Sequence, residues 1–149
     1  MTDHVFLGYA FYDGALDALS YIKISKKHLI PNTRKHFKSS AEWTFQQDNA
    51  GFHAANEVTM MLEAQEVDIL YWPPFSPDLS LIENVWPVME RKIATRPHAT
   101  KTDLKKAIED VISEMSQEEP ITRLFEKLYL SLPKRFVLVM AGGGVARKY

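Results

Sequence analysis

The stretch that decides the fold is a short alternating segment, Trp43-Thr44-Phe45-Gln46-Gln47-Asp48. Successive side chains of an extended strand point to opposite faces, so Trp43, Phe45 and Gln47 would share one face. Asp48 then stands at the carboxyl end of the strand. The segment therefore predicts a strand that presents a carboxylate at its end.

The flanking residues extend this strand into a repeating pattern. Apolar residues recur at helical spacing from Ala55 to Gln65, and residues 67–72 form a second apolar run before two prolines. Upstream, residues 5–12 are rich in aromatic and β-branched side chains, which predicts another strand. A helix is expected over residues 17–28, with Pro31 interrupting it.

The C-terminal half has only helical periodicity. One amphipathic helix is expected to follow Ser76-Pro77-Asp78, with Asp78 as its cap, and a second to begin near Thr100, where Asp103 completes a capping box. A third helix is expected to follow Pro120, and the glycine-rich tail from Ala141 to Tyr149 should be frayed. Strands that alternate with helices, followed by helices alone, predict one α/β domain with a small sheet.

Composition narrows the class of protein. The chain has 149 residues, of which 46% are hydrophobic, as expected for one globular domain. It has no cysteine, so oxygen or imidazole groups must hold any metal ion. There is no apolar run of about eighteen residues and no signal-like N-terminus, so we expect no membrane partner and an intracellular location.

The charge balance argues against tight DNA binding by the chain alone. Its formal net charge is −1, whereas modules that bind phosphate backbones are usually basic. Basic residues do gather in two places, but such runs are more often solvated helix faces, so no DNA-binding residue is assigned. The two groups are Lys23, Lys26, Lys27, Arg34, Lys35 and Lys38, and Arg91, Lys92 and Arg96.

Two carboxylates, Asp48 and Glu83, are candidate metal ligands. Asp48 ends a predicted strand, and Glu83 lies one turn into a predicted helix, beside the buried-face residue Ile82. They can converge if that helix crosses the edge of the sheet. Oxygen clusters suit Mg²⁺ or Mn²⁺, and phosphodiester chemistry on two such ions uses about three carboxylates. From the pattern alone, such residues are more often a strand-ending turn residue, at Asp48, and an exposed helix residue, at Glu83, than a metal site.

Two longer motifs resemble those of mariner-superfamily DNA transposases. Residues 45–53 are similar to the segment around that family's second catalytic aspartate, and residues 72–86 to the segment that carries its final acidic ligand. The spacing between Asp48 and Glu83 agrees with the branch of the family that ends in glutamate. Further similarity, at residues 11–14, 21–22, 29–31, 131–135 and 143–149, extends the resemblance to nearly the whole chain.

The resemblance implies a fold, an activity and a cofactor. The fold is an α/β, ribonuclease-H-like (DDE integrase/transposase) fold, with a small mixed sheet flanked by helices and a helical C-terminal part. The implied activity is metal-dependent cleavage and transfer of DNA strands, with transposon ends as the partner. For a eukaryotic protein, the resemblance also implies a nuclear location. Asp48 and Glu83 would be catalytic ligands of Mg²⁺ or Mn²⁺.

The chain departs from the family pattern at its N-terminal end. The family's first catalytic aspartate lies on an earlier strand, and neither Asp3 nor Asp13 matches it. We therefore expect residues 1–149 to be a catalytic-domain fragment that lacks the first strand and the helix-turn-helix DNA-binding modules. With two of three ligands, it should have little or no nuclease activity alone.

Neighbouring residues have secondary roles in this interpretation. Asn49 is expected to support Asp48, and His53 to shape the site or contact phosphate, although a lone histidine is more often structural. Trp72 and Trp86 are interpreted as core aromatics rather than base-stacking residues.

Two other hypotheses fit the same residues. A degenerate or domesticated remnant would act as a protein-interaction or dimerisation module, since missing strands leave unpaired backbone groups and apolar surface. Alternatively, the gene model is incomplete, and the missing aspartate is encoded upstream of Met1.

Overall fold

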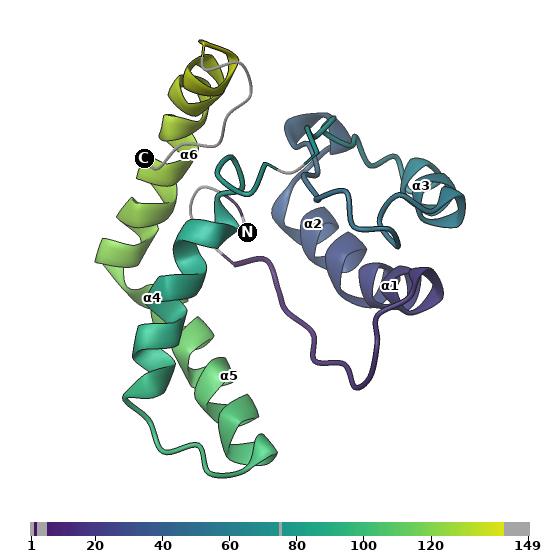
Figure 1. The fold of residues 1–149 in the computed structure, drawn as a ribbon. Helices are drawn as coiled ribbons and strands as arrows, with labels where there is room; N and C mark the ends of the chain where they lie inside the picture. The colour runs from purple at the N-terminus through teal and green to yellow at the C-terminus, as the bar shows by residue number, and fades with distance from the viewer. Residues whose placement is uncertain (1, 3–5, 75, 142–149) are drawn as a thin grey trace. The chain divides into compact units, whose positions relative to one another are not determined.

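The computed structural model describes residues 2, 6–74 and 76–141. The chain forms two units: unit 1 comprises Met1–Phe6 with Ser76–Tyr149, and unit 2 comprises Leu7–Phe75. The helices labelled α4 to α6 in Figure 1 belong to unit 1, and α1 to α3 belong to unit 2. That the two units make one domain stays a prediction.

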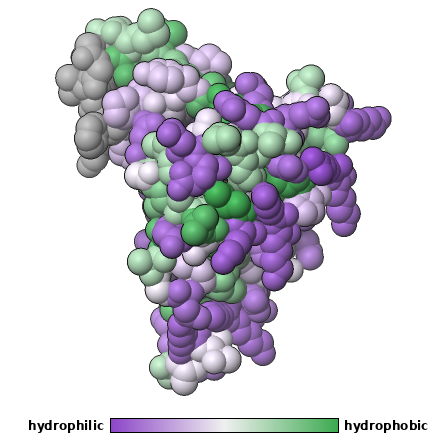
Figure 2. Space-filling view, turned by 90° about the vertical axis from the view of Figure 1, so that its right-hand side faces the viewer, coloured by the Kyte–Doolittle hydropathy of each residue, from purple (hydrophilic) through white to green (hydrophobic). Residues whose placement is uncertain are grey.

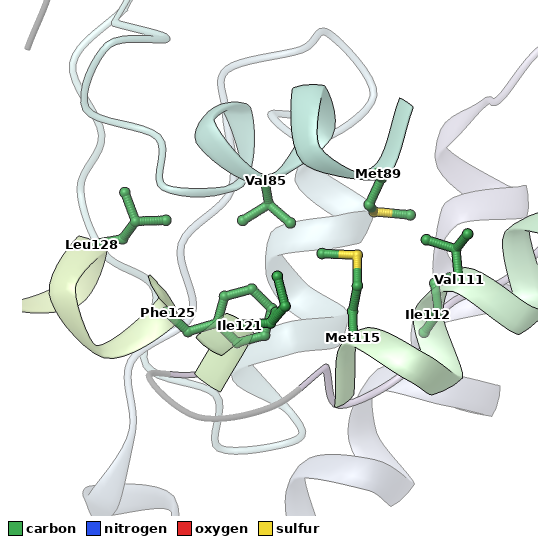
Figure 3. Packing of buried hydrophobic residues seen from close by; sticks show 8 residues of the cluster. All are labelled: Val85, Met89, Val111, Ile112, Met115, Ile121, Phe125 and Leu128. Carbon is green, nitrogen blue, oxygen red and sulfur yellow. The ribbon is translucent and has the colours of Figure 1, made fainter. Parts of the chain in front are cut away.

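The described residues of unit 1 form three helices, α4 (Ile82–Ala94), α5 (Lys101–Gln117) and α6 (Glu119–Ala141). Each has an apolar face at the spacing expected from the sequence, and these faces meet in one core (Figure 3). The helical periodicity predicted for this half is thereby confirmed. The core residues are Val85 and Met89 from α4, Val111, Ile112 and Met115 from α5, and Ile121, Phe125 and Leu128 from α6.

The helix starts in unit 1 follow the sequence in one case and depart from it in another. The capping box at α5 is confirmed: Asp103 N donates to Thr100 Oγ1 at 3.1 Å, and Thr100 N donates to Asp103 Oδ2 at 3.1 Å. The predicted cap of α4 is wrong. Its N-cap is Leu81, which makes no side-chain cap hydrogen bond, and Asp78 lies in turns that precede the helix.

The first helices of unit 2 form a continuous helical segment, made of α1 (Ala18–Ile24), the π-helical turn η1 (Ser25–Leu29) and α2 (Ile30–His36). The predicted interruption at Pro31 is therefore wrong. A proline ring normally clashes with the carbonyl four residues earlier. The wider π turn lies immediately before Pro31, with Ile30 N donating to Ser25 O, and it lets the helical path continue.

The rest of unit 2 contains the predicted strand–helix–strand region. A 3-10 turn, η2 (Ser40–Glu42), precedes it, and α3 (Asn56–Glu63) lies at its centre. The two predicted strands meet at a single parallel bridge between Phe45 and Ile69. A parallel pairing is what two strands joined by a helix require.

The predicted mixed sheet is not confirmed. Apart from the bridge at Phe45, the described residues contain no strand, and residues 6–12 have no regular structure. The physical reason is that a strand is stabilised by hydrogen bonds to a neighbour rather than within itself, and the one β-bridge among the described residues joins Phe45 to Ile69 and does not involve residues 6–12. Val5, the first residue of that predicted strand, lies outside the described residues.

The surface mixes polar and apolar side chains. Figure 2 shows hydrophilic residues over most of one face, with smaller groups of hydrophobic residues between them. Trp72 is buried, which confirms its assignment to the core, whereas Trp86 is 43% exposed and its assignment was wrong. In the described part of the chain, no helix is both long and apolar enough to span a membrane. The predicted frayed tail after Ala141 lies outside the described residues.

Candidate metal-binding residues and their surroundings

Asp48 presents a carboxylate to solvent at the end of the bridge-forming segment. Its side chain is 69% exposed, and Oδ1 lies 2.6 Å from His53 Nδ1 and accepts a hydrogen bond from Ala50 N at 3.2 Å. Because a carboxylate oxygen only accepts, we assign the His53 proton to Nδ1. Among the described residues, none bonds to Oδ2, so that oxygen is available to a cation.

His53 is held in turn by the first helix of unit 2. Tyr21 on α1 donates its hydroxyl to Gln47 Oε1 at 2.9 Å, and Gln47 Nε2 donates to the His53 carbonyl oxygen at 3.4 Å. The Tyr21 and His53 rings also lie against each other, with centroids 4.4 Å apart. These contacts, which run from Tyr21 through Gln47 to His53, are called the relay below. The sequence analysis did not predict the relay, because Tyr21 and Gln47 are far apart in the sequence and no motif links them.

Tyr21 remains a neutral donor over a wide pH range. Burial raises the pKa of Tyr21 to about 12, and the Asp48 charge acts in the same direction. A protonated phenol can donate to Gln47 and keep the relay intact. The relay therefore fixes the orientation of His53, and through it the Oδ1 atom of Asp48.

Asn49 does not bond to Asp48. Its Nδ2 donates to the Trp72 carbonyl oxygen at 2.9 Å, which ties the segment after Asp48 to the end of the other bridge-forming segment. Any support that Asn49 gives to Asp48 is therefore indirect, through the backbone. Its role in the site stays a prediction.

Glu83 lies in the first turn of α4 and is exposed. Its backbone N donates to Ser80 O at 3.3 Å, so the turn before the helix sets its position. A negative side chain in a first helical turn is favoured by the helix dipole. A buried arginine on α6, Arg135, bonds to this turn, which the sequence analysis did not foresee. The sequence indicates only that Arg135 is buried, because Arg135 stands seven positions after Leu128 in the apolar stripe of α6.

The two carboxylates belong to different units, Asp48 to unit 2 and Glu83 to unit 1. Their convergence on one cation stays a prediction. Each is an exposed hard oxygen donor, which fits Mg²⁺ or Mn²⁺. Within the described ranges, no group of three or more histidine, aspartate or glutamate side chains is placed to hold a metal ion.

The two basic groups have different surroundings. In the first group, on and just after α1 to α2, all six side chains are exposed, as a solvated helix face would be. In the second group, Lys92 Nζ bonds to Glu118 Oε1 at 2.8 Å and Arg96 Nη2 bonds to Glu114 Oε2 at 2.6 Å. Lys92 and Arg96 are thus ion-paired within unit 1, which gives both residues a structural role. The structure does not favour a DNA contact for either residue.

Comparison with known proteins identifies the family. The model of the DDE superfamily endonuclease family matches residues 20–105, a stretch that includes both Asp48 and Glu83. The chain therefore belongs to the DDE superfamily endonuclease family, and its resemblance to mariner-type transposases is confirmed.

Among full-length relatives, the transposase of transposable element Tcb1 from Caenorhabditis briggsae is 29% identical over 140 residues. That alignment covers 91% of this chain and 47% of the relative. The chain thus spans about half the length of this relative.

Solved structures support the fold. The Mos1 transposase catalytic domain, in a structure with raltegravir and Mg, matches with a TM-score of 0.82 at 18% identity, covering 98% of this chain and 73% of that chain. A second Mos1 structure, with raltegravir and Mn, matches with a TM-score of 0.76 at 18% identity over 91% of this chain and 67% of that one. The fold of the chain is accordingly similar to that of the Mos1 catalytic domain.

Proposed function

We infer that this chain is part of a transposase catalytic domain in which Asp48 and Glu83 bind Mg²⁺ or Mn²⁺. In the whole protein, this site would cleave and transfer DNA strands at transposon ends. The observation that carries the proposal is the exposed carboxylate of Asp48, which His53 contacts at Oδ1 and not at Oδ2. Asp48 also lies within the residues that the family model matches. The solved Mos1 catalytic domains, whose structures include Mg or Mn, support the choice of metal.

The residues of this chain would bind and orient rather than react. Asp48 would offer Oδ2 to the cation, while Oδ1 stays bonded to His53 Nδ1. Glu83 would offer its carboxylate from the first turn of α4. Bound divalent cations supply the activation of water or a DNA 3′-hydroxyl and the stabilisation of the leaving oxygen.

The 149-residue chain, tested by itself, should cut DNA slowly or not at all. Two of its carboxylates are assigned here as ligands, whereas clamping both ions of a two-metal site takes about three. We expect a site with two carboxylate ligands to bind a cation weakly. Such a site would lack the negative charge that is needed to balance two metal ions during strand cleavage. Metal binding and DNA cleavage are therefore separate tests of the proposal.

Metal binding can be tested by thermal unfolding with Mn²⁺ and with EDTA. A ligand that binds the folded state raises its stability, so the melting temperature of the wild-type chain should rise with Mn²⁺. The rise should disappear in Asp48→Ala and Glu83→Ala and persist in Glu90→Ala, an exposed control on α4. Equal rises in all four proteins would refute the assigned ligands.

DNA cleavage can be tested with supercoiled plasmid in Mn²⁺. We expect the wild-type chain to nick no faster than the Asp48→Ala and Glu83→Ala variants. Robust nicking that both substitutions abolish would overturn the expectation of inactivity, while supporting the two residues as ligands.

A second function, dimerisation as an interaction module, is favoured by an exposed apolar face on α6. Leu130, Val137 and Met140 are 67%, 64% and 79% exposed. Large exposed apolar groups are typical of association surfaces. Light scattering should then show a dimer that Val137→Glu converts to monomer. A monomeric wild-type chain would exclude this function.

A further inference from the structure

We propose that Arg135 is a positioning residue for Glu83. Its buried guanidinium would fix the turn that leads into α4, and thereby the place where the Glu83 carboxylate stands. The proposal rests on the proposed function, in which Glu83 is a metal ligand. It adds a residue from the far end of the chain to that site.

The guanidinium contacts both ends of the turn. Arg135 Nη1 donates to the Asp78 carbonyl oxygen at 2.9 Å, and Nη2 donates to Asn84 Oδ1 at 3.4 Å. The third contact, from Nε to Ser131 Oγ at 2.8 Å, holds the side chain against its own helix. Glu83 lies between the two contacted residues.

A second set of bonds connects this clamp to Glu83 itself. Asn84 Nδ2 donates to the Ser80 carbonyl oxygen at 3.3 Å, and the Glu83 backbone N donates to the same oxygen at 3.3 Å. Arg135 therefore acts on Glu83 through Asn84 and Ser80. A guanidinium suits this geometry because its donors form a planar fork of fixed shape.

The start of α4 depends on such contacts because it has no side-chain cap. The N-cap residue Leu81 makes none, and the apolar anchor of the turn is Leu79, which is 0% exposed. Burial of Leu79 restricts the position of the turn, but it provides no hydrogen-bond partners for the backbone polar groups of the turn. Arg135 supplies a partner for the Asp78 carbonyl oxygen.

The burial of the Arg135 guanidinium, which is charged, also requires an explanation. Arg135 is 6% exposed, and an aliphatic side chain packed in its place would avoid the desolvation cost of a guanidinium. Buried charged groups can be retained because they specify one arrangement rather than because they add stability. A positional role at Glu83 accounts for the charge.

The test compares two variants at Arg135 with a matched control in the full chain. Arg135→Gln removes the charge and the fork, and Arg135→Lys keeps the charge alone. Arg123→Gln is the control, since Arg123 lies on the same helix, is 66% exposed and pairs with Glu119. The two measurements are amide hydrogen exchange and the dissociation constant for Mn²⁺.

Exchange reports on the turn directly. In Arg135→Gln we expect the amides of Leu79, Ser80 and Glu83 to exchange at least about 10-fold faster, while those of Val111 and Met115 in α5 keep their rates. Loss of general stability would instead accelerate all of them together. Arg135→Lys should give an intermediate effect, and it provides the readout if the glutamine variant does not fold.

Metal affinity reports on the consequence for Glu83. Substitution of residues that orient a metal ligand typically weakens binding by about 10- to 100-fold, so we expect at least a 10-fold weaker Mn²⁺ affinity in Arg135→Gln. Arg123→Gln should bind as the wild type does. Unchanged turn exchange, or unchanged affinity beside faster turn exchange, would overturn the proposal.

The two proposals fail in different ways. If the wild-type chain binds no Mn²⁺ through Glu83, the proposed function fails, and the role of Arg135 at a metal site fails with it, even where the turn exchanges faster. If the wild type binds Mn²⁺ and Arg135→Gln binds it equally well, the proposed function stands and only the role of Arg135 is refuted.

Discussion

Unit 1 and unit 2 differ in how closely they follow their sequence. In unit 1 the apolar spacing predicts three helices, and all three form and share one core. In unit 2 one alternating segment and two apolar segments predict strands, and among the described residues one parallel bridge forms. A helix makes its hydrogen bonds within itself, whereas a strand needs a neighbour, so local pattern suffices for the first and not for the second.

The two candidate ligands also differ, in what determines their orientation. Asp48 is oriented through its side chain, by a histidine that α1 holds in place. Glu83 is oriented through its backbone, by the turn that precedes α4. The first arrangement depends on contacts between side chains and the second on the path of the main chain. Substitutions should therefore affect the two regions differently.

The largest expected effect is on the core of unit 1. Phe125 is fully buried and makes an edge contact with Phe6, with ring centroids 5.1 Å apart. Phe125→Ala should lower the free energy of unfolding by about 4 kcal/mol, because it removes buried apolar surface and leaves a cavity. Urea denaturation measures this. Tyr129→Ala, at a 53% exposed position on the same helix, should change stability by less than about 0.5 kcal/mol. Similar losses in both variants would contradict the assigned core.

The sequence predicts those parts of the molecule whose signals are local. The capping box of Thr100 and Asp103 lies within four consecutive residues, and it forms as expected. The start of α4 could not be predicted, because Arg135, 57 positions after Asp78, bonds to the turn before it. The path through Pro31 depends on a π turn, for which the sequence gives no simple rule.

The candidate site also contains residues that the sequence predicts and residues that it does not. Asp48 and Glu83 could be proposed from motifs in the sequence, and the family match includes both. The relay from Tyr21 through Gln47 to His53 could not, because its members come together only when α1 packs beside the bridge-forming segment. Motifs thus indicate the ligands, and only the fold indicates what holds them.

A smaller effect should distinguish the bridge of unit 2 from the helices of unit 1. Two backbone hydrogen bonds form the bridge, Phe45 N to Asp68 O at 2.7 Å and Leu70 N to Phe45 O at 2.9 Å. So short a ladder should open locally, so we expect the Phe45 and Leu70 amides to exchange at least about 10-fold faster than that of Val111 in α5. Native-state hydrogen exchange measures the rates. Equal protection would indicate a more extensive sheet around Phe45.

The smallest effect concerns the titration of Tyr21. Burial raises the pKa of Tyr21 to about 12, so its contribution to stability should be complete below the ordinary tyrosine pKa of 10.0 and should be lost as the pH rises through about 12. Absorbance titration should show one phenol that ionises later than the others, and Tyr21→Phe should remove that late step. Ionisation of all six tyrosines near the ordinary value would contradict the buried relay.

The most direct test of the account is whether Asp48 and Glu83 bind the same cation. Mn²⁺ affinity is measured for the wild-type chain, Asp48→Ala, Glu83→Ala and the double variant. If the two residues share one ion, each single substitution should weaken binding by at least about 10-fold, and the double should be little worse than either. Single effects that simply add, or wild-type affinity in either single variant, would contradict a shared site.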